Sequence, residues 1–162
     1  MPVIRDAVPA DAAAIAEIYT ESIVQGDATM DETPWTPAQV TGMMAAHSAR
    51  EGFIVLEHGG EVLGWGVYKR YSPRTGYRFA GETATYLRRD KTGAGHGSRL
   101  KRALIERCRA SGYRHLVARV FADNAASVAY NQRLGYTVVG TQRQIGFRSG
   151  RWVDVTILQL IL

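Results

Sequence analysis

The sequence predicts a mixed α/β fold in which one sheet is covered by helices on both faces. Short runs rich in β-branched and aromatic residues alternate along the chain with segments whose apolar residues recur at helical spacing. With 162 residues, of which 46% are hydrophobic, the chain is long enough for one well-filled core and too short for two ordinary domains. We therefore expect a single domain that spans residues 1–162.

The first third of the chain is predicted to form a strand and two helices. Residues 3–5 are expected to be a short strand, and Pro9 opens a helix with apolar positions on one face. Glycine, aspartate and proline in residues 25–35 indicate a loop. The pair Thr36–Pro37 is typical of a helix start, and this second helix is expected to end near Arg50.

The middle of the chain is predicted to form a hairpin and a further strand. Two apolar runs, residues 53–57 and 62–68, flank a His-Gly-Gly turn. After a polar stretch over residues 70–78, residues 82–87 are rich in strand formers and end at charged residues. This last run is the fourth expected strand.

Helices and strands are expected to alternate in the last part of the chain. Residues 97–111 place their apolar side chains on one face, which includes Cys108, and Gly112 supplies a stop signal. Cys108 is therefore interpreted as a core residue. The remaining elements are predicted to be a strand over residues 116–121, a helix over 124–134, and two strands over 137–141 and 153–160.

Composition excludes several classes of protein. No run approaches the roughly 20 apolar residues of a membrane span, and the first residues lack the apolar run of a signal peptide, so we expect a cytoplasmic protein without a membrane partner. A single cysteine excludes an internal disulfide framework, and the four histidines show no metal-ligand spacing, so we expect no metal. The net charge of +5 is not arranged as a basic stripe, so we expect no nucleic-acid partner; the charge fits a polyanionic small ligand or a solvated face.

The glycine-rich segment Gly93–Ser98 is the most informative local feature. It lies between a predicted strand and a predicted helix, where exposed backbone N–H groups can approach an anion at the helix N-terminus. We expect it to hold a phosphate, with a plain glycine-rich turn as the alternative. A Rossmann dinucleotide site is disfavoured because Ser98 replaces the third glycine and only about forty residues remain to complete a doubly wound sheet.

Two segments, Thr92–Gly97 and Asn124–Tyr136, resemble motifs of the GCN5-related N-acetyltransferases. The segment Thr92–Gly97 is similar to the pyrophosphate loop Gln/Arg-x-x-Gly-x-Gly/Ala, except that threonine stands first. A phosphate contact is then expected from Arg88, Arg89 or Lys91 instead. The second segment, Asn124–Tyr136, is similar to Asn-x-x-(Ser/Ala)-x-x-x-(Tyr/His)-x-x-Leu-Gly-(Phe/Tyr).

The second segment carries one match and one departure. By resemblance Asn124 would bond the pantetheine arm of the cofactor, and an ordinary helix N-cap is its alternative role. Asn131 stands where the family has the tyrosine or histidine that often protonates the departing thiolate, and the neighbouring Tyr130 is expected to face the core. The general acid is therefore left unassigned.

Within this superfamily the chain resembles the phosphinothricin and methionine sulfoximine acetyltransferase group nearly end to end. The likeness lies in Ala28–Pro34, Arg74–Arg78, Glu82–Tyr86, the asparagine helix and Gly146–Asp154. The resemblance implies a mostly antiparallel, twisted sheet splayed between its fourth and fifth strands. It also implies acetyl-coenzyme A as co-substrate, direct transfer in a ternary complex, and a homodimer.

The implied reaction needs a base, because a substrate ammonium cannot attack a thioester until it loses a proton. Glu82 is the candidate, since it lies where the family keeps its catalytic glutamate; an exposed charge at a strand end is the alternative. Backbone N–H groups near Tyr86 and Leu87 are expected to stabilise the thioester oxyanion. The expected cofactor-binding residues are Tyr86, Leu87, Arg88, Thr92, Gly93, Gly95, His96, Gly97, Ser98, Asn124 and Asn131.

The expected amine site uses three further residues. Arg74 is proposed to pair with a carboxylate or phosphinate, Tyr77 to form a wall and donate a hydrogen bond, and Met30 to close an apolar side. A solvated arginine and ordinary core packing are the alternatives for these residues. Acetylation of another amino acid, a polyamine or a protein N-terminus, and a noncatalytic coenzyme A or nucleotide-binding module, remain as alternative functions.

Overall fold

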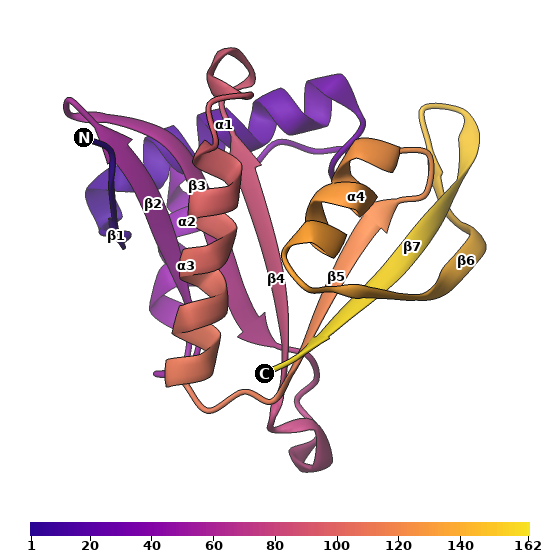
Figure 1. Ribbon diagram of the computed structural model, residues 1–162. Coiled ribbons are helices and arrows are strands. Elements are labelled where there is room, and N and C mark those ends of the chain that lie inside the picture. Colours follow the sequence, from indigo (N-terminus) through magenta and orange to yellow (C-terminus); the bar gives the residue numbers. More distant parts are fainter.

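The computed structural model describes residues 1–162 and is built on a single seven-stranded sheet with the order β1-β2-β3-β4-β5-β7-β6 (Figure 1). The strands are β1 (Val3–Asp6), β2 (Gly52–His58), β3 (Glu61–Arg70), β4 (Ala80–Leu87), β5 (His115–Phe121), β6 (Thr137–Arg148) and β7 (Arg151–Ile161). Every neighbouring pair is antiparallel except β4 and β5, which run parallel. The predicted mixed, mostly antiparallel α/β fold is confirmed.

Helices cover both faces of this sheet. They are α1 (Ala12–Gln25), α2 (Pro37–Ala46), α3 (His96–Ala110) and α4 (Ala125–Arg133), with short 3-10 segments η1 (Pro9–Asp11), η2 (Thr75–Tyr77) and η3 (Arg89–Lys91). In Figure 1, α3 and α4 lie in front of the sheet and α1 and α2 behind it. Alternate residues of each strand serve the two faces, so that Ile54 and Leu56 pack with α3 whereas Phe53 and Val55 pack with α1 and α2.

Local signals in the sequence set several element boundaries. The second helix begins where predicted, because the Thr36 hydroxyl accepts from the Gln39 N–H at 3.2 Å and the Gln39 amide accepts from the Thr36 N–H at 2.8 Å. The first helix ends at Gly26, whose φ of 71° lies in the left-handed region. Cys108 is fully buried, as predicted for a core residue.

Two expected boundaries are wrong. Helix α2 ends at Ala46 and not near Arg50, since the backbone is extended at His47 and the Arg50 guanidinium bonds the carbonyls of Arg78 and Ser111. Strand β6 runs to Arg148 and not to residue 141. Its pairing with β7 is interrupted by irregularities at residues 138–140 and 142–146. Nearly all of its residues are exposed, so the sequence lacks the alternation of apolar and polar residues that marks a half-buried strand.

Strands β4 and β5 stay paired over only three residues each. Their register runs from Ala80 opposite His115 to Glu82 opposite Val117, after which the strands diverge toward the glycine turn above α3 (Figure 1). This divergence divides the sheet into β1–β4 on one side and β5, β7 and β6 on the other. The splay that the resemblance implied is present.

Candidate active site

Two cavities open at the divergence of β4 and β5, one on each face of the sheet. The α3-side cavity has a volume of about 100 Å³ and is lined by β4, β5, α3 and α4. The α1-side cavity has a volume of about 290 Å³ and is lined by α1, the loop after it, β3, β4 and β5. Thr83, Ala84, Tyr86 and Arg119–Phe121 belong to both linings, so the cavities meet at the split.

The backbone of β4 turns unpaired hydrogen-bonding groups toward this split. Arg88 donates its N–H to Leu63 and Tyr71 donates to Ala80, which places the main-chain groups of even-numbered β4 residues against β3. The groups of Thr85 and Leu87 therefore face the gap, where β5 no longer pairs with them. Of the two expected positions for an oxyanion donor, the backbone N–H of Leu87 faces the gap, whereas the Tyr86 main chain pairs with Trp65. The backbone N–H of Thr85 also faces the gap and is a further candidate that the sequence did not reveal.

The glycine turn presents free N–H groups at the start of α3. Gly93 and Gly95 have φ of 86° and 78°, a left-handed conformation that favours glycine. The first hydrogen bond of the helix runs from the Arg99 N–H to the Gly95 carbonyl at 3.1 Å, so the N–H groups of residues 96–98 have no helical partner. The His96 Nδ1 atom is also buried without a partner. This arrangement is suited to an anion.

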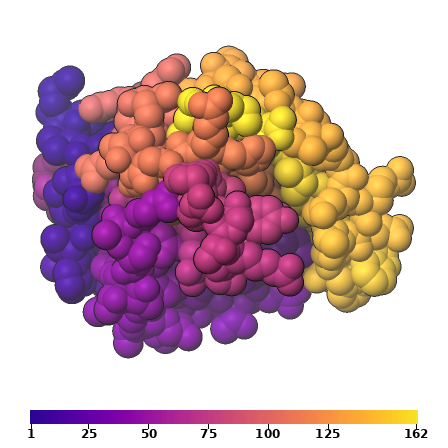
Figure 2. All heavy atoms as spheres, turned by 90° about the horizontal axis from the view of Figure 1, so that it is seen from below, coloured from indigo at the N-terminus to yellow at the C-terminus, as the bar shows by residue number.

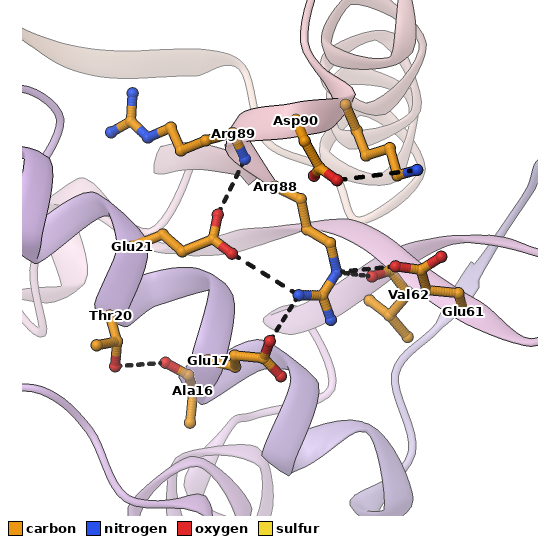
Figure 3. A network of polar contacts seen from close by, with 10 residues as sticks. Ala16, Glu17, Thr20, Glu21, Glu61, Val62, Arg88, Arg89 and Asp90 are labelled. Carbon is orange, nitrogen blue, oxygen red and sulfur yellow. Dashed lines mark hydrogen bonds and ion pairs between the residues drawn. The ribbon is translucent and has the colours of Figure 1, made fainter.

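Arg88 does not contribute a free cation to that turn. Its guanidinium lies among the carboxylates of Glu17, Glu21 and Glu61, at 2.9, 3.8 and 3.5 Å, and its side chain is 13% exposed (Figure 3). It also donates to the Val62 carbonyl at 2.8 Å. The geometry does not favour the expected phosphate contact from Arg88. Its ion pairs and hydrogen bond instead anchor the start of the turn to α1 and β3.

The neighbouring residues of the turn are partly engaged as well. The Arg89 guanidinium pairs with Asp27 at 2.6 Å, and the backbone N–H of Arg89 donates to the Glu21 carboxylate at 2.9 Å. The Thr92 hydroxyl donates to the Arg89 carbonyl at 3.2 Å. Lys91 has only the adjacent Asp90 at 4.0 Å, so it is the side-chain cation of the turn that is least occupied by carboxylates.

Helix α4 lines the α3-side cavity. Asn124 caps this helix by accepting from the Ser127 N–H at 3.1 Å, and it also lines the cavity, so its two expected roles are compatible. Asn131 is 4% exposed and donates to the Ser127 carbonyl at 2.9 Å, while its Oδ1 atom is buried without a partner. Tyr130 was expected to face the core; it lines the cavity instead and donates to the Gly97 carbonyl at 2.6 Å. Burial raises the pKa of Tyr130 to about 12.

Glu82 lies in the α1-side cavity as the third residue of β4, not at the exposed head of that strand. Its carboxylate forms an ion pair with Arg119 of β5, and the two side chains are 25% and 40% exposed. Lys69 faces Glu82 across the β3–β4 register and lines the same cavity. Arg119 was missed by sequence reasoning, although a charged residue inside an otherwise apolar strand is a signal for it.

Aromatic rings line the cavity that contains Glu82. Tyr19 stacks on Trp35 with ring centroids 3.8 Å apart, and Trp65 stacks on Tyr86 at 4.7 Å. Burial raises the pKa of Tyr86 to about 12, so its phenol stays neutral at physiological pH. Met30 lies in this lining as expected. The cavity thus combines an apolar wall with a few charged groups, which is typical of a site for a small molecule.

Arg74 and Tyr77 lie outside this lining. Both belong to the segment between β3 and β4. Figure 2, seen from below, shows residues around 70–80 in the foreground at the centre of the molecule, with β6 and β7 on the right. Tyr77 packs edge-on against Tyr71 at 5.4 Å, and the Arg119 guanidinium lies 5.8 Å from the Tyr71 ring. The segment therefore contacts the Glu82–Arg119 pair through Tyr71 and does not enter the cavity.

Two general features of the structure bear on the site. Histidine, cysteine, aspartate and glutamate side chains do not gather in any group of three that could hold a metal ion. None of the helices is both long and apolar enough to cross a membrane.

Comparisons with known proteins agree with this geometry. Residues 4–157 match the acetyltransferase (GNAT) domain family. The L-methionine sulfoximine/L-methionine sulfone acetyltransferase of Pseudomonas paraeruginosa is 40% identical over 98% of this chain and 94% of that protein. The phosphinothricin N-acetyltransferase of Alcaligenes faecalis is 33% identical over 92% of this chain and 77% of that protein.

A solved structure shows the same fold with a ligand. The GNAT superfamily phosphinothricin acetyltransferase from Sinorhizobium meliloti, in complex with acetyl-coenzyme A, superimposes with a TM-score of 0.93 and 34% identity, covering 99% of this chain and 88% of that one. Because the family match covers the divided sheet, the glycine turn and both cavities, the chain belongs to the GNAT family and is an acetyltransferase.

Proposed function

We propose that the protein transfers the acetyl group of acetyl-coenzyme A to the primary amine of a small amino-acid-like molecule such as methionine sulfoximine, methionine sulfone or phosphinothricin. The observation that carries this proposal is the meeting of two cavities at the split between β4 and β5, with Glu82 in one of them. The relatives with those three substrates in their names match this chain nearly end to end.

The polar groups along the α3-side cavity and the glycine turn fit a long ligand that is anionic at one end and carries amide groups along its length. The N–H groups of residues 96–98 would hold the pyrophosphate, with Lys91 beside them. The unpaired backbone of Thr85 and Leu87, the Asn124 amide and the orphaned Asn131 oxygen would bond the pantetheine arm. Acetyl-coenzyme A, when bound, supplies an activated acyl thioester.

The α1-side cavity would hold the amine. Two cations, Lys69 and Arg119, line it together with two carboxylates, Asp31 and Glu82. This balance favours a substrate that carries both an ammonium and an acid group over a polyamine, which would bring only positive charge. Tyr19, Trp35 and Met30 would pack against the apolar part of the side chain.

Glu82 would act as the general base of a direct transfer. Its carboxylate faces the amine cavity and is partly exposed, so it can accept a proton from the substrate ammonium and pass it to solvent. Arg119 orients that carboxylate through their ion pair. Cys108 is a poor acyl carrier, because its thiol is fully buried and burial raises its pKa to about 12.

A substrate panel tests the proposed function. Consumption of acetyl-coenzyme A is measured with methionine sulfoximine, methionine sulfone, phosphinothricin, common amino acids, a polyamine and an N-terminal peptide. We expect the highest kcat/KM among the first three compounds. Preference for the peptide or the polyamine would contradict the substrate class, and binding of acetyl-coenzyme A without turnover of any amine would favour a noncatalytic module.

A further inference from the structure

Lys101 is a buried cation that the proposed reaction has not yet used. It lies on the apolar face of α3, is 3% exposed and lines the α3-side cavity. Its ammonium donates to the Thr83 hydroxyl at 2.8 Å and lies 5.1 Å from the centroid of the Tyr136 ring. A lysine ammonium has three N–H donors, and only one of them has a hydrogen-bond partner in the chain.

No carboxylate compensates this charge. The charged residues that share the cavity are Asp27 and Arg119, and each is already paired, Asp27 with Arg89 and Arg119 with Glu82. The other titratable groups around the ammonium are the Cys108 thiol on α3 and the phenols of Tyr136 and Tyr130, whose pKa values burial raises to about 12. These groups are neutral at physiological pH, so Lys101 is a charge that burial penalises without an anion in place.

The position of Lys101 mirrors that of Glu82. Glu82 and Thr83 are consecutive residues of β4, so their side chains point to opposite faces of the sheet. Glu82 faces the amine cavity, whereas Thr83 holds Lys101 at the cavity on the other face. A reacting group placed in the split would have a carboxylate on the side where the amine enters and an ammonium on the side where the thiol leaves.

We propose that Lys101 is the acid that donates a proton to the sulfur of coenzyme A as the thioester is cleaved. This inference rests on the proposed function. A departing thiolate is stabilised by a positive charge or a proton nearby, and Lys101 is the buried group of this cavity that can supply both. Asn131, which lines the same cavity, can supply neither.

The protons balance in this scheme. The amine nitrogen bonds to the acetyl carbon while the carbon–sulfur bond breaks, and the electron pair of that bond stays on sulfur. Lys101 gives one proton to the sulfur and regains one from solvent after the products leave. The substrate ammonium loses two protons in becoming an amide, and both pass through Glu82 to solvent, so each turnover releases one proton in total.

The acidity of Lys101 is suited to this task. Burial lowers its pKa to about 8, close to the ordinary value of about 8.5 for a thiol. The ammonium form is therefore present at pH 7 and gives up its proton with little difference in free energy. Above pH 8 the lysine becomes neutral, so the wild-type kcat should fall as the pH rises through that value.

Two variants test the proposal. Lys101→Met keeps the length of the side chain and removes its charge. Lys101→Arg keeps the positive charge, but a guanidinium does not release its proton at these pH values. The first readout is the ultraviolet absorbance of the thiolate of bound coenzyme A, titrated against pH. We expect the thiol pKa to be lowered in the wild type and in Lys101→Arg, and to rise above the free value in Lys101→Met.

The second readout is the kcat for the best amine of the panel. Both variants should lose on the order of 10²-fold at pH 7, and Lys101→Met should lack the fall in kcat above pH 8. An unchanged thiol pKa in Lys101→Met, or a kcat of Lys101→Arg equal to that of the wild type, would overturn the proposal. If Lys101→Arg does not fold, the comparison of the pH profiles of the wild type and Lys101→Met decides.

Two controls separate this proposal from the proposed function and from misfolding. Removing a buried unpaired charge should not destabilise the fold, so the Tm of Lys101→Met at pH 7 should be at least that of the wild type. The thiol titration uses coenzyme A alone and requires no amine. A wild type that lowers the thiol pKa but acetylates none of the panel would contradict the proposed substrates while leaving the role of Lys101 supported.

Discussion

At the scale of single residues, the site depends on consecutive side chains of one strand that serve different cavities. Glu82 faces the amine side with Arg119 as its partner, and Thr83 faces the cofactor side with Lys101 as its partner. The alternation of a β-strand thus places Glu82, the proposed base, and Thr83, the partner of the proposed acid Lys101, on opposite faces of the sheet.

The role of Glu82 is tested by Glu82→Gln, which keeps the size of the side chain but cannot take a proton. We expect kcat to fall by roughly 10²- to 10⁴-fold at neutral pH, while the affinity for acetyl-coenzyme A measured by calorimetry is largely preserved. The loss should shrink at high pH, because more of the amine then arrives neutral. Glu106→Gln is the matched control, since Glu106 lies on the solvent side of α3 and its side chain is 69% exposed. Near wild-type kcat from pH 6 to 9 would show that Glu82 is only a polar group of the strand.

Arg74 and Lys69 are the two candidates for binding the acid group of the substrate. The sequence favours Arg74, whereas Lys69 is a cation that lines the cavity. Because Arg74 lies outside the cavity, we expect Lys69→Met to raise the KM for the amine and to leave the KM for acetyl-coenzyme A nearly unchanged, whereas Arg74→Ala changes neither. A rise of the amine KM in Arg74→Ala, with no effect of Lys69→Met, would assign the contact to Arg74.

At the scale of elements, the N-terminus of α3 and the strand before it form one unit. Arg88 fastens the end of β4 to α1, and Tyr130 of α4 bonds the first turn of α3 through the Gly97 carbonyl. Three elements thus hold the free N–H groups of the turn in place before any ligand arrives. A site that is organised in advance loses less conformational entropy on binding.

Gly97→Val tests this anion site. A Cβ at Gly97 would lie 3.4 Å from Leu87 and 3.7 Å from the Tyr130 hydroxyl, which are ordinary contacts, so the fold should tolerate the change. The added methyl groups should obstruct the approach of a phosphate to the helix N-terminus and weaken acetyl-coenzyme A binding by at least about tenfold. Gly95 is a poorer position for this test, because its φ of 78° would strain any larger residue. Gly42→Val on α2 is the control, and equal affinities of both variants by calorimetry would refute the assignment.

At the scale of the whole molecule, the arm of β6 and β7 projects to one side (Figure 1). This arm carries exposed apolar side chains. Val139, Ile145, Phe147 and Trp152 are 58%, 59%, 56% and 62% exposed. Phe147 and Trp152 form an edge-on pair across the two strands at 5.0 Å. Apolar groups gathered in this way are typical of a surface that another chain covers, which supports the homodimer that the resemblance implied.

Light scattering tests this dimer. We expect the wild type at micromolar concentration to have twice the 17.8 kDa mass of one chain, and Trp152→Asp to have the single-chain mass with an unchanged circular dichroism spectrum. Val3→Asp is the control, because Val3 is 56% exposed on β1, at the opposite edge of the sheet from β6. A monomeric wild type, or a dimer indifferent to the charge at residue 152, would contradict this interface.

The sequence by itself determined the order of the elements, the glycine turn and the identity of the base candidate. These features depend on neighbours along the chain: alternation in a strand, helical spacing, a Thr-Pro helix start, and motifs with a fixed number of residues between their members. Backbone conformation responds first to such local signals. The second half of strand β6 was not predicted, because neither face of this strand is buried enough to impose an alternation of apolar and polar residues.

Only the tertiary structure decided which charged residues are free to act. Arg88 was a phosphate candidate until the fold surrounded it with three carboxylates, and Arg74 was a substrate candidate that the fold leaves outside the cavity. No sequence pattern singled out Lys101, yet packing of α3 on β4 brings it to Thr83, eighteen positions away in the sequence. The physical reason is that a charge acts through its neighbours in space and through the loss of water around it, and both are set by the packing of distant segments.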